Sequence, residues 1–167
     1  MGAVNVLGMS SRGWLKWSKS PNYRSPQGWD RGLGAFLEPG EHVKHAFQAT
    51  SGHRGTRWLG IDSSRPNQAW GGPIPLPPVA FALGVRNYVV AVTDRAVVII
   101  RTSLSMGYPK EQVARLPRAT RLGPFVGNGV ITVGGIEMYV WEVADLQAVQ
   151  DADGEIGYDC PAPPSLW

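Results

Sequence analysis

The basic residues of this chain suggest one kind of chemistry, the binding of anions. Arg115, Arg118 and Arg121 recur at every third position, and Lys16 and Lys19 lie among tryptophans near the N-terminus. Guanidinium and ammonium groups bind phosphate and carboxylate oxygens. These five residues are therefore the candidate anion-binding residues. In a strand, a spacing of three alternates between faces, so the three arginines do not form one continuous basic stripe.

The charges are divided unevenly along the chain. Residues 1–32 hold five basic residues and one acid, and residues 33–135 hold eleven basic residues and five acids. Residues 136–167 hold seven acids and no Lys or Arg. One interpretation is that surplus basic charge binds an anionic partner. The alternative is that the acidic C-terminal segment neutralises the arginines of 115–121 within the fold.

The residue patterns of common enzymes and metal sites are missing from the sequence. There is no Walker loop, no dinucleotide fingerprint, no GxSxG and no HExxH. His42 and His45 are three apart, which places them on opposite faces of a strand, and His53 is the only other histidine. We therefore expect a protein that is not an enzyme, with no metal and no cofactor.

Tryptophans and prolines supply a second group of candidates, for contact with a protein partner: Trp14, Trp17, Trp70, Pro75 and Pro77. The Trp-rich N-terminal segment suits a membrane interface or a nucleic acid, or its tryptophans pack on the domain while its charges face water. The Pro-rich segment at 62–82 favours an extended conformation. It docks in a partner's aromatic groove or wraps the domain's own surface.

The segment Arg86 to Arg101 is the element around which we expect the fold to be organised. Two runs rich in Val and Ile, Tyr88 to Val92 and Ala96 to Ile100, flank a polar break of turn length. β-Branched side chains favour strands, so the pattern predicts a central β-hairpin. If Thr93 pairs with Ala96, both faces of the hairpin are apolar. We therefore expect a barrel interior on one face and an arm or helix on the other.

Further elements follow from the same reasoning. His42 to Thr50 is predicted as the first strand, and Gly134-Gly135 is predicted as the turn between strands Val130 to Val133 and Ile136 to Trp141. Glu142 to Asp153 is predicted as a helix with Val143, Leu146 and Val149 facing inward. The predicted core comprises Val90, Val92, Val97, Ile99, Ile131, Val133 and Tyr139.

The domain organisation is predicted as one domain with appendages. We divide the chain into a basic Trp-rich arm at 1–34, a barrel domain at 35–153 with a Pro-rich insertion at 62–82, and a tail at 154–167. The single cysteine, Cys160, excludes an internal disulfide. No segment has the pattern of a secretory signal or a membrane helix. We expect a cytoplasmic protein, with peripheral membrane association as an option.

The order of segments resembles uncharacterised actinobacterial pleckstrin-homology-like (PH-like) proteins over roughly residues 37–153. The segments that carry the resemblance are LEPGEHV, YVVAVTDRAVVI, ARLPRATRLGP, and GGIEMYVW followed by a helix ending QDAD. The resemblance implies a mainly β fold, a partly open antiparallel barrel capped by one C-terminal helix. Relatives of the wider fold bind phosphoinositides, peptides or proteins. We therefore expect a non-catalytic binding or scaffold module for a protein partner or an anionic membrane surface. Nucleic-acid binding through the basic arm is the alternative, and a homo-oligomer stays open.

Overall fold

The structure is a computed structural model that describes residues 25–51, 84–103, 108–127, 129–140 and 142–163. Six antiparallel strands form one curled, half-barrel sheet in the order β4-β3-β2-β1-β6-β5. The strands are β1 (Val43–Ser51), β2 (Arg86–Thr93), β3 (Ala96–Thr102), β4 (Pro109–Pro117), β5 (Val130–Val133) and β6 (Ile136–Tyr139). Helix α6 (Val143–Gly154) follows the last strand. The predicted fold class, mainly β with a C-terminal helix on a partly open barrel, is confirmed.

The central hairpin has the predicted register. β2 pairs with β3 so that Val92 lies opposite Val97 and Val90 lies opposite Ile99. The turn is fixed by Thr93, whose hydroxyl accepts the Ala96 N–H at 2.8 Å and the Arg95 N–H at 3.1 Å. A threonine side chain therefore stabilises a turn that has no glycine.

The core on the concave face of the sheet lies between the strands and α6. The seven residues predicted for the core are all buried, but only six of them belong to this cluster: Val90, Val92, Val97, Ile99, Ile131 and Val133. Tyr139 is buried outside it, and its neighbours Met138 and Val140 face the concave core instead. Leu146, Val149 and Ala152 of α6 pack against this cluster. Burial of such a cluster stabilises the fold by about 25 cal/mol per Å² of apolar surface removed from water.

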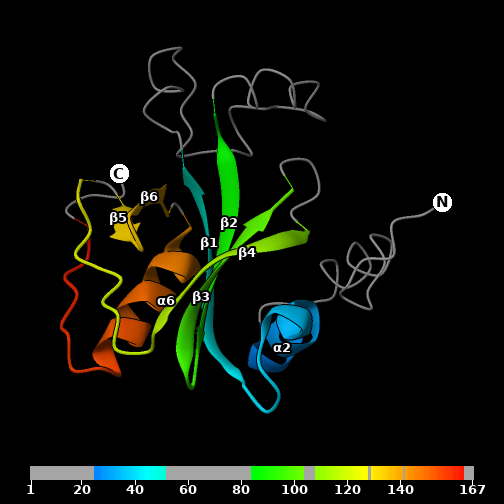
Figure 1. Cartoon of the computed structure of the whole chain (residues 1–167). Helices are drawn as coiled ribbons and strands as arrows, with labels where there is room; N and C mark the ends of the chain where they lie inside the picture. The colour runs from blue at the N-terminus through cyan, green and yellow to red at the C-terminus, as the bar shows by residue number, and fades with distance from the viewer. Residues whose placement is uncertain (1–24, 52–83, 104–107, 128, 141, 164–167) are drawn as a thin grey trace.

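The opposite face of the hairpin is covered by helix α2 (Pro26–Leu33), which continues into a short 3₁₀ helix, η1 (Gly34–Phe36). Trp29 and Leu33 are four residues apart, so they share one side of α2. They pack with outward-facing side chains of the hairpin, including Val89, Val98 and Ile100. Figure 1 shows α2 and α6 on opposite sides of the sheet. Coverage of both hairpin faces is therefore confirmed.

Helix α2 lies within residues 1–34, the segment predicted as an arm, where proline and glycine would disfavour a helix interior. Pro26 is instead the first residue of α2, a position where the missing N–H would have no intrahelical partner in any case. Ser25 caps the helix by accepting the Gly28 N–H at 3.1 Å. The buried Trp29 therefore packs on the sheet. This agrees, for Trp29, with the interpretation in which the tryptophans of the arm pack on the domain.

One part of the predicted inward face of α6 is wrong. Leu146 and Val149 are buried, but Val143 is 66% exposed. A spacing of three residues turns about 300° around a helix, so each step drifts about 60° from the previous side chain. Val143 therefore lies about 60° away from Leu146 around the helix axis and off the buried face. Asp145 and Asp153 each lie four residues from Val149, on the same side of the helix, and both are buried.

The β5–β6 hairpin closes part of the barrel. Gly134 and Gly135 form its two-residue turn with positive φ values of 59° and 79°, which only glycine adopts readily. A Cβ at Gly134 would lie 3.2 Å from Leu116 on β4. The turn therefore lies close to β4, the strand at the opposite edge of the sheet. The gap between the two edges of the half-barrel is narrow at this point, although β4 and β5 do not pair.

Candidate functional site

Arg115, the first of the predicted anion-binding arginines, is engaged by acidic side chains of the fold. Its Nη2 atom lies 2.9 Å from both carboxylate oxygens of Glu41 and 3.3 Å from Glu38 Oε1. The Glu41 side chain has no exposed surface, and it also accepts hydrogen bonds from the Thr93 hydroxyl and, at 2.8 Å, from the Glu38 N–H. The cluster joins β4 to the β2–β3 turn.

The hydrogen bonds around Glu41 determine its ionisation. Burial on its own raises the pKa of the Glu41 carboxyl, but the bonds from Thr93, the Glu38 N–H and Arg115 together hold that pKa below its ordinary value. Glu41 is therefore a buried carboxylate, and its charge is balanced by Arg115. An external anion that approached Arg115 would compete with this internal partner.

Arg118 also has an acidic partner, at the end of α6. Its Nη2 atom lies 2.6 Å from Glu155 Oε2, and His45 Nε2 lies 2.9 Å from Glu155 Oε1. Lys44 lies further away, at 3.6 Å. The hydrogen bond from His45 is the main reason that the pKa of Glu155 is lowered, and Arg118 adds to it. The C-terminal segment thus neutralises Arg118, whereas Arg115 is neutralised by Glu38 and Glu41.

Arg121 has an aromatic partner. Its guanidinium carbon lies 4.7 Å from the centre of the Tyr158 ring, which is a cation–π distance. The structure therefore places the three arginines in three separate environments and does not bring them together as one anion site. Their binding of an external anion stays a prediction. Lys16, Lys19, Trp14, Trp17, Trp70, Pro75 and Pro77 lie outside the described residues.

The two histidines of the first strand region have separate partners, as the prediction of opposite faces requires. His42 Nδ1 lies 3.0 Å from Asp30 Oδ2 of α2, whereas His45 contacts Glu155 beyond α6. Each histidine therefore links the strand to a different covering helix. Within the described parts of the chain, no group of three or more His, Cys, Asp or Glu side chains could hold a metal ion.

Two exposed basic residues at one end of the sheet were missed by the sequence analysis. Arg86 begins β2, and Lys110 lies near the start of β4. The register aligns Asn87 with Thr102 and Thr102 with Pro109, so Arg86 and Lys110 lie two strands apart and are offset along the strands by about two residues, a separation of roughly 12 Å. Neither has an acidic partner among the described residues, and Lys110 Nζ lies 5.8 Å from the Tyr108 ring centre. Only the strand register could have shown that they share an end.

The same end of the sheet is the origin of the long connection between β1 and β2. β1 ends at Ser51, which pairs with Arg86 at the start of β2, so the described residues on either side of the connection 52–83 meet at this end of the sheet. That segment contains Arg54, Arg57 and Arg65 but only one acid, Asp62. This end, which we call the basic end, lies towards the top of Figure 1.

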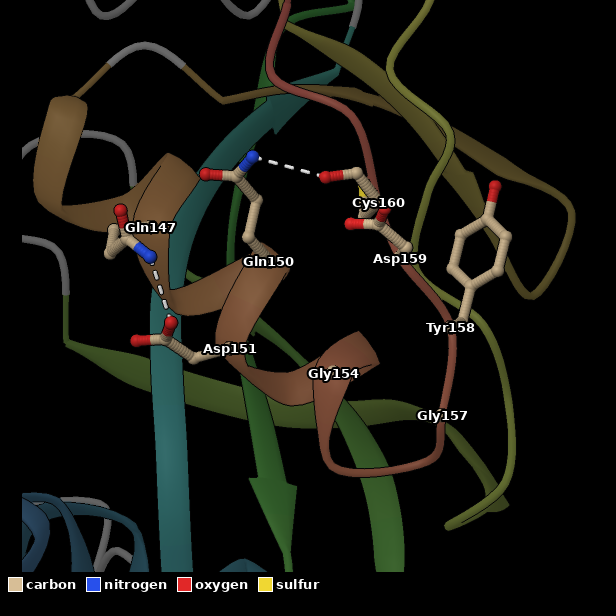
Figure 2. Close-up of a pocket in the computed structure, with 8 residues that line it drawn as sticks. All are labelled: Gln147, Gln150, Asp151, Gly154, Gly157, Tyr158, Asp159 and Cys160. Carbon is tan, nitrogen blue, oxygen red and sulfur yellow. Dashed lines mark hydrogen bonds between the residues drawn. The ribbon is translucent and has the colours of Figure 1, made fainter.

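A groove with polar walls lies beside the C-terminal half of α6. It has a volume of about 390 Å³ and is lined by Gln147, Gln150, Asp151, Gly154, Gly157, Tyr158, Asp159 and Cys160. Figure 2 shows the helix side chains on one wall and residues 158–160 on the other. The Gln150 side-chain amide donates to the Cys160 carbonyl at 3.1 Å, which ties the two walls together.

The wall formed by residues 158–160 is anchored in the core. Asp153 is completely buried and accepts the Leu122 and Gly123 N–H groups, each at 2.8 Å. Cys160 is buried against Gly123, where an added Cβ would lie 2.3 Å from its sulfur. Burial, and then the nearby charge of Asp153, raise the pKa of the Cys160 thiol. The segment predicted as a tail thus contributes a core residue.

Comparison with protein-family models, curated proteins and solved structures found no match. No helix among the described residues has the length and apolar character needed to cross a membrane.

Proposed function

We propose that this chain is a non-catalytic binding module of the PH-like type that docks on an anionic membrane surface through its basic end. The observation that carries the proposal is the pair of exposed cations, Arg86 and Lys110, at one end of the half-barrel. Cations without internal partners attract anionic headgroups, at about 1 kcal/mol for each residue near the surface.

The arrangement of the elements supports the PH-like part of the proposal. The strands form a meander that returns to pair with β1, and the C-terminal helix then packs across the concave face. The resemblance of the sequence segments implies this kind of capped barrel. Because a fold alone does not define a ligand, the choice of an anionic surface depends on the basic end.

The contacts that the other charged groups make within the fold support the choice of site. Glu41 and Asp153, both buried, are engaged in holding the fold together, and Arg115 and Arg118 are neutralised by carboxylates. Cations that are already paired gain little from an external anion, because the internal pair must first be broken. Arg86 and Lys110 carry no such cost and share one end of the sheet, whereas Arg31, which also has no carboxylate partner in the described part of the chain, lies on α2. The pair at the basic end is therefore the best suited to an external anion.

Co-sedimentation with vesicles tests the proposal. The full chain should bind vesicles that contain phosphatidylserine more strongly than vesicles of phosphatidylcholine alone, and added salt should weaken the binding. The Arg86→Glu, Lys110→Glu double variant should lose most of this binding. Arg31→Glu is the matched control, because Arg31 is an exposed base on α2, away from the basic end.

Any of three results would contradict the proposal. Equal sedimentation with both kinds of vesicle at low salt would show that there is no anion-dependent docking. Full binding by a well-folded double variant would show that other cations are responsible, with Lys16 and Lys19 of the arm the next residues to reverse. A binding loss in Arg31→Glu as large as in the double variant would show a general charge effect.

A further inference from the structure

The groove beside α6 has unbalanced negative charge. Asp151 and Asp159 line it, both are exposed, and neither has a cationic partner among the described residues. Asp151 accepts one hydrogen bond at 2.8 Å, from the Gln147 side-chain amide. The other exposed carboxylates among the described residues each contact a basic side chain: Glu38, Asp94, Glu111 and Glu155. The groove therefore differs from the rest of the described acidic surface.

The walls of the groove offer mainly oxygen atoms. Gln147 and Gln150 use their amide nitrogens on Asp151 and on the Cys160 carbonyl, so their side-chain oxygens are left as acceptors. The groove also flanks the C-terminal end of α6, where the helix dipole is negative, and the last turn of α6 has no basic residue. A donor-rich cation fits these acceptors better than an anion or a neutral acceptor.

The groove is a fixed feature of the fold. The chain reverses direction after α6, where the Gly157 N–H bonds the Gly154 carbonyl and the Tyr158 N–H bonds the Asp153 carbonyl. Gly157 has a φ of 77°, a conformation in which glycine is strongly favoured. Because Cys160 and Asp153 are buried, both walls are held by the core. A ligand would meet a preformed site and would not need to order it.

From these observations we propose that the groove binds a lysine- or arginine-bearing segment of a protein partner. A volume of about 390 Å³ is at the lower end of the range for ligand pockets, and it accommodates one or two long side chains. The cationic end of such a side chain lies beside Asp151 or Asp159 and donates to a glutamine oxygen. The site is separate from the basic end, and this inference does not depend on the proposed membrane docking.

A peptide titration on the full chain tests the inference. The probe is a fluorescent twelve-residue peptide of alternating Lys and Ser, and its binding is followed by anisotropy at low salt. The Asp151→Asn, Asp159→Asn double variant should bind it at least tenfold more weakly than wild type. Glu111→Gln, which removes one carboxylate charge from the edge strand β4, is the control for loss of charge outside the groove and should bind within twofold of wild type. The side-chain amide NMR signals of Gln147 and Gln150 should shift when the peptide is added.

Three outcomes would overturn the inference. The first is a wild-type protein that does not bind the peptide, and the second is a folded double variant that binds it as well as wild type. The third is displacement of the peptide by Mg²⁺ or Ca²⁺ at a concentration too low to act by screening, which would assign the groove to a metal ion. The double Asn variant should still bind anionic vesicles, so failure of this inference and failure of the proposed function are distinguishable.

Discussion

At the scale of single residues, the charged side chains of this protein act mainly on one another. Glu41 and Glu155 each bond to an arginine and to at least one further donor, and the net effect of their surroundings is to lower the pKa of both carboxyls. Arg115 and Arg118 are therefore parts of the framework that holds β4 and α6 in place. The cations that we expect to bind a ligand, Arg86 and Lys110, lie at the basic end and take no part in these ion pairs.

Acid should destabilise the fold through these carboxylates. Each has a lower pKa in the folded chain than its ordinary value of 4.5, so the unfolded chain takes up protons first as the pH falls. Their contribution to stability is fully present above about pH 5 and decreases as the pH falls through 4.5 towards the folded pKa values. Denaturant unfolding between about pH 3 and 7 measures this. Glu155→Gln should show a shallower loss below pH 4.5, and an unchanged slope would remove Glu155 from the explanation.

Ile99 should be a major core residue. Its side chain is completely buried, so Ile99→Ala should lower the free energy of unfolding by about 2–4 kcal/mol through lost burial and a cavity. Val113→Ala is the control, because Val113 lies on the same sheet and is 42% exposed, and it should change stability by about 0.5 kcal/mol or less. Equal unfolding midpoints for the two variants would contradict the strand register.

At the scale of elements, α6 separates a buried face from a solvent face. Leu146→Asp would place an unpaired charge in the core and should unfold the protein or make it aggregate. Val143→Asp makes the same chemical change at an exposed site in the first turn, where the helix dipole favours an acid. It should melt within a few degrees of wild type. A cooperative melt of Leu146→Asp near the wild-type temperature would show that α6 does not cap the barrel.

The connection between β4 and β5 is held to the C-terminal segment at Gly123. In Gly123→Ala the new methyl group would overlap the sulfur of Cys160, so the variant should lose about 1–3 kcal/mol of stability. Cys160→Ala removes the sulfur, so the double variant should be more stable than the sum of the two single effects predicts. Denaturant titrations of the four proteins measure this coupling, and strictly additive effects would mean that the two residues do not touch.

At the scale of the whole molecule, local patterns predicted five of the six strands and the C-terminal helix, but not β4 (Pro109–Pro117), and distant partners decided the rest. The hairpin register followed from β-branched runs and a turn of fixed length. The alternative that the acidic C-terminal segment neutralises the arginines of 115–121 holds for Arg118, which contacts Glu155. The individual partners of Arg115 and Arg118 could not be predicted, because Glu41 and Glu155 are 74 and 37 residues away in the chain. The prediction that Val143 faces inward was wrong for a local reason, because side chains spaced three residues apart drift around the helix.

The candidate sites depend on the same long-range geometry. Arg86 and Lys110 come together only because β2, β3 and β4 align in one register. The groove exists only because residues 158–160 fold back along α6. The resemblance to PH-like proteins predicted a binding module of this shape, but which surfaces remain free for a ligand had to be read from the contacts in the fold.

Amide hydrogen exchange of the full chain, with and without phosphatidylserine vesicles, locates the surface that docks on the membrane. Docking through the basic end should slow exchange around residues 84–88 and 108–112, at the start of β2 and of β4, with little change in α6 or residues 158–160. The Arg86→Glu, Lys110→Glu variant should show no such protection. Vesicle-dependent protection confined to α6, or no protection at the basic end while the protein is bound, would show that the basic end is not the docking surface.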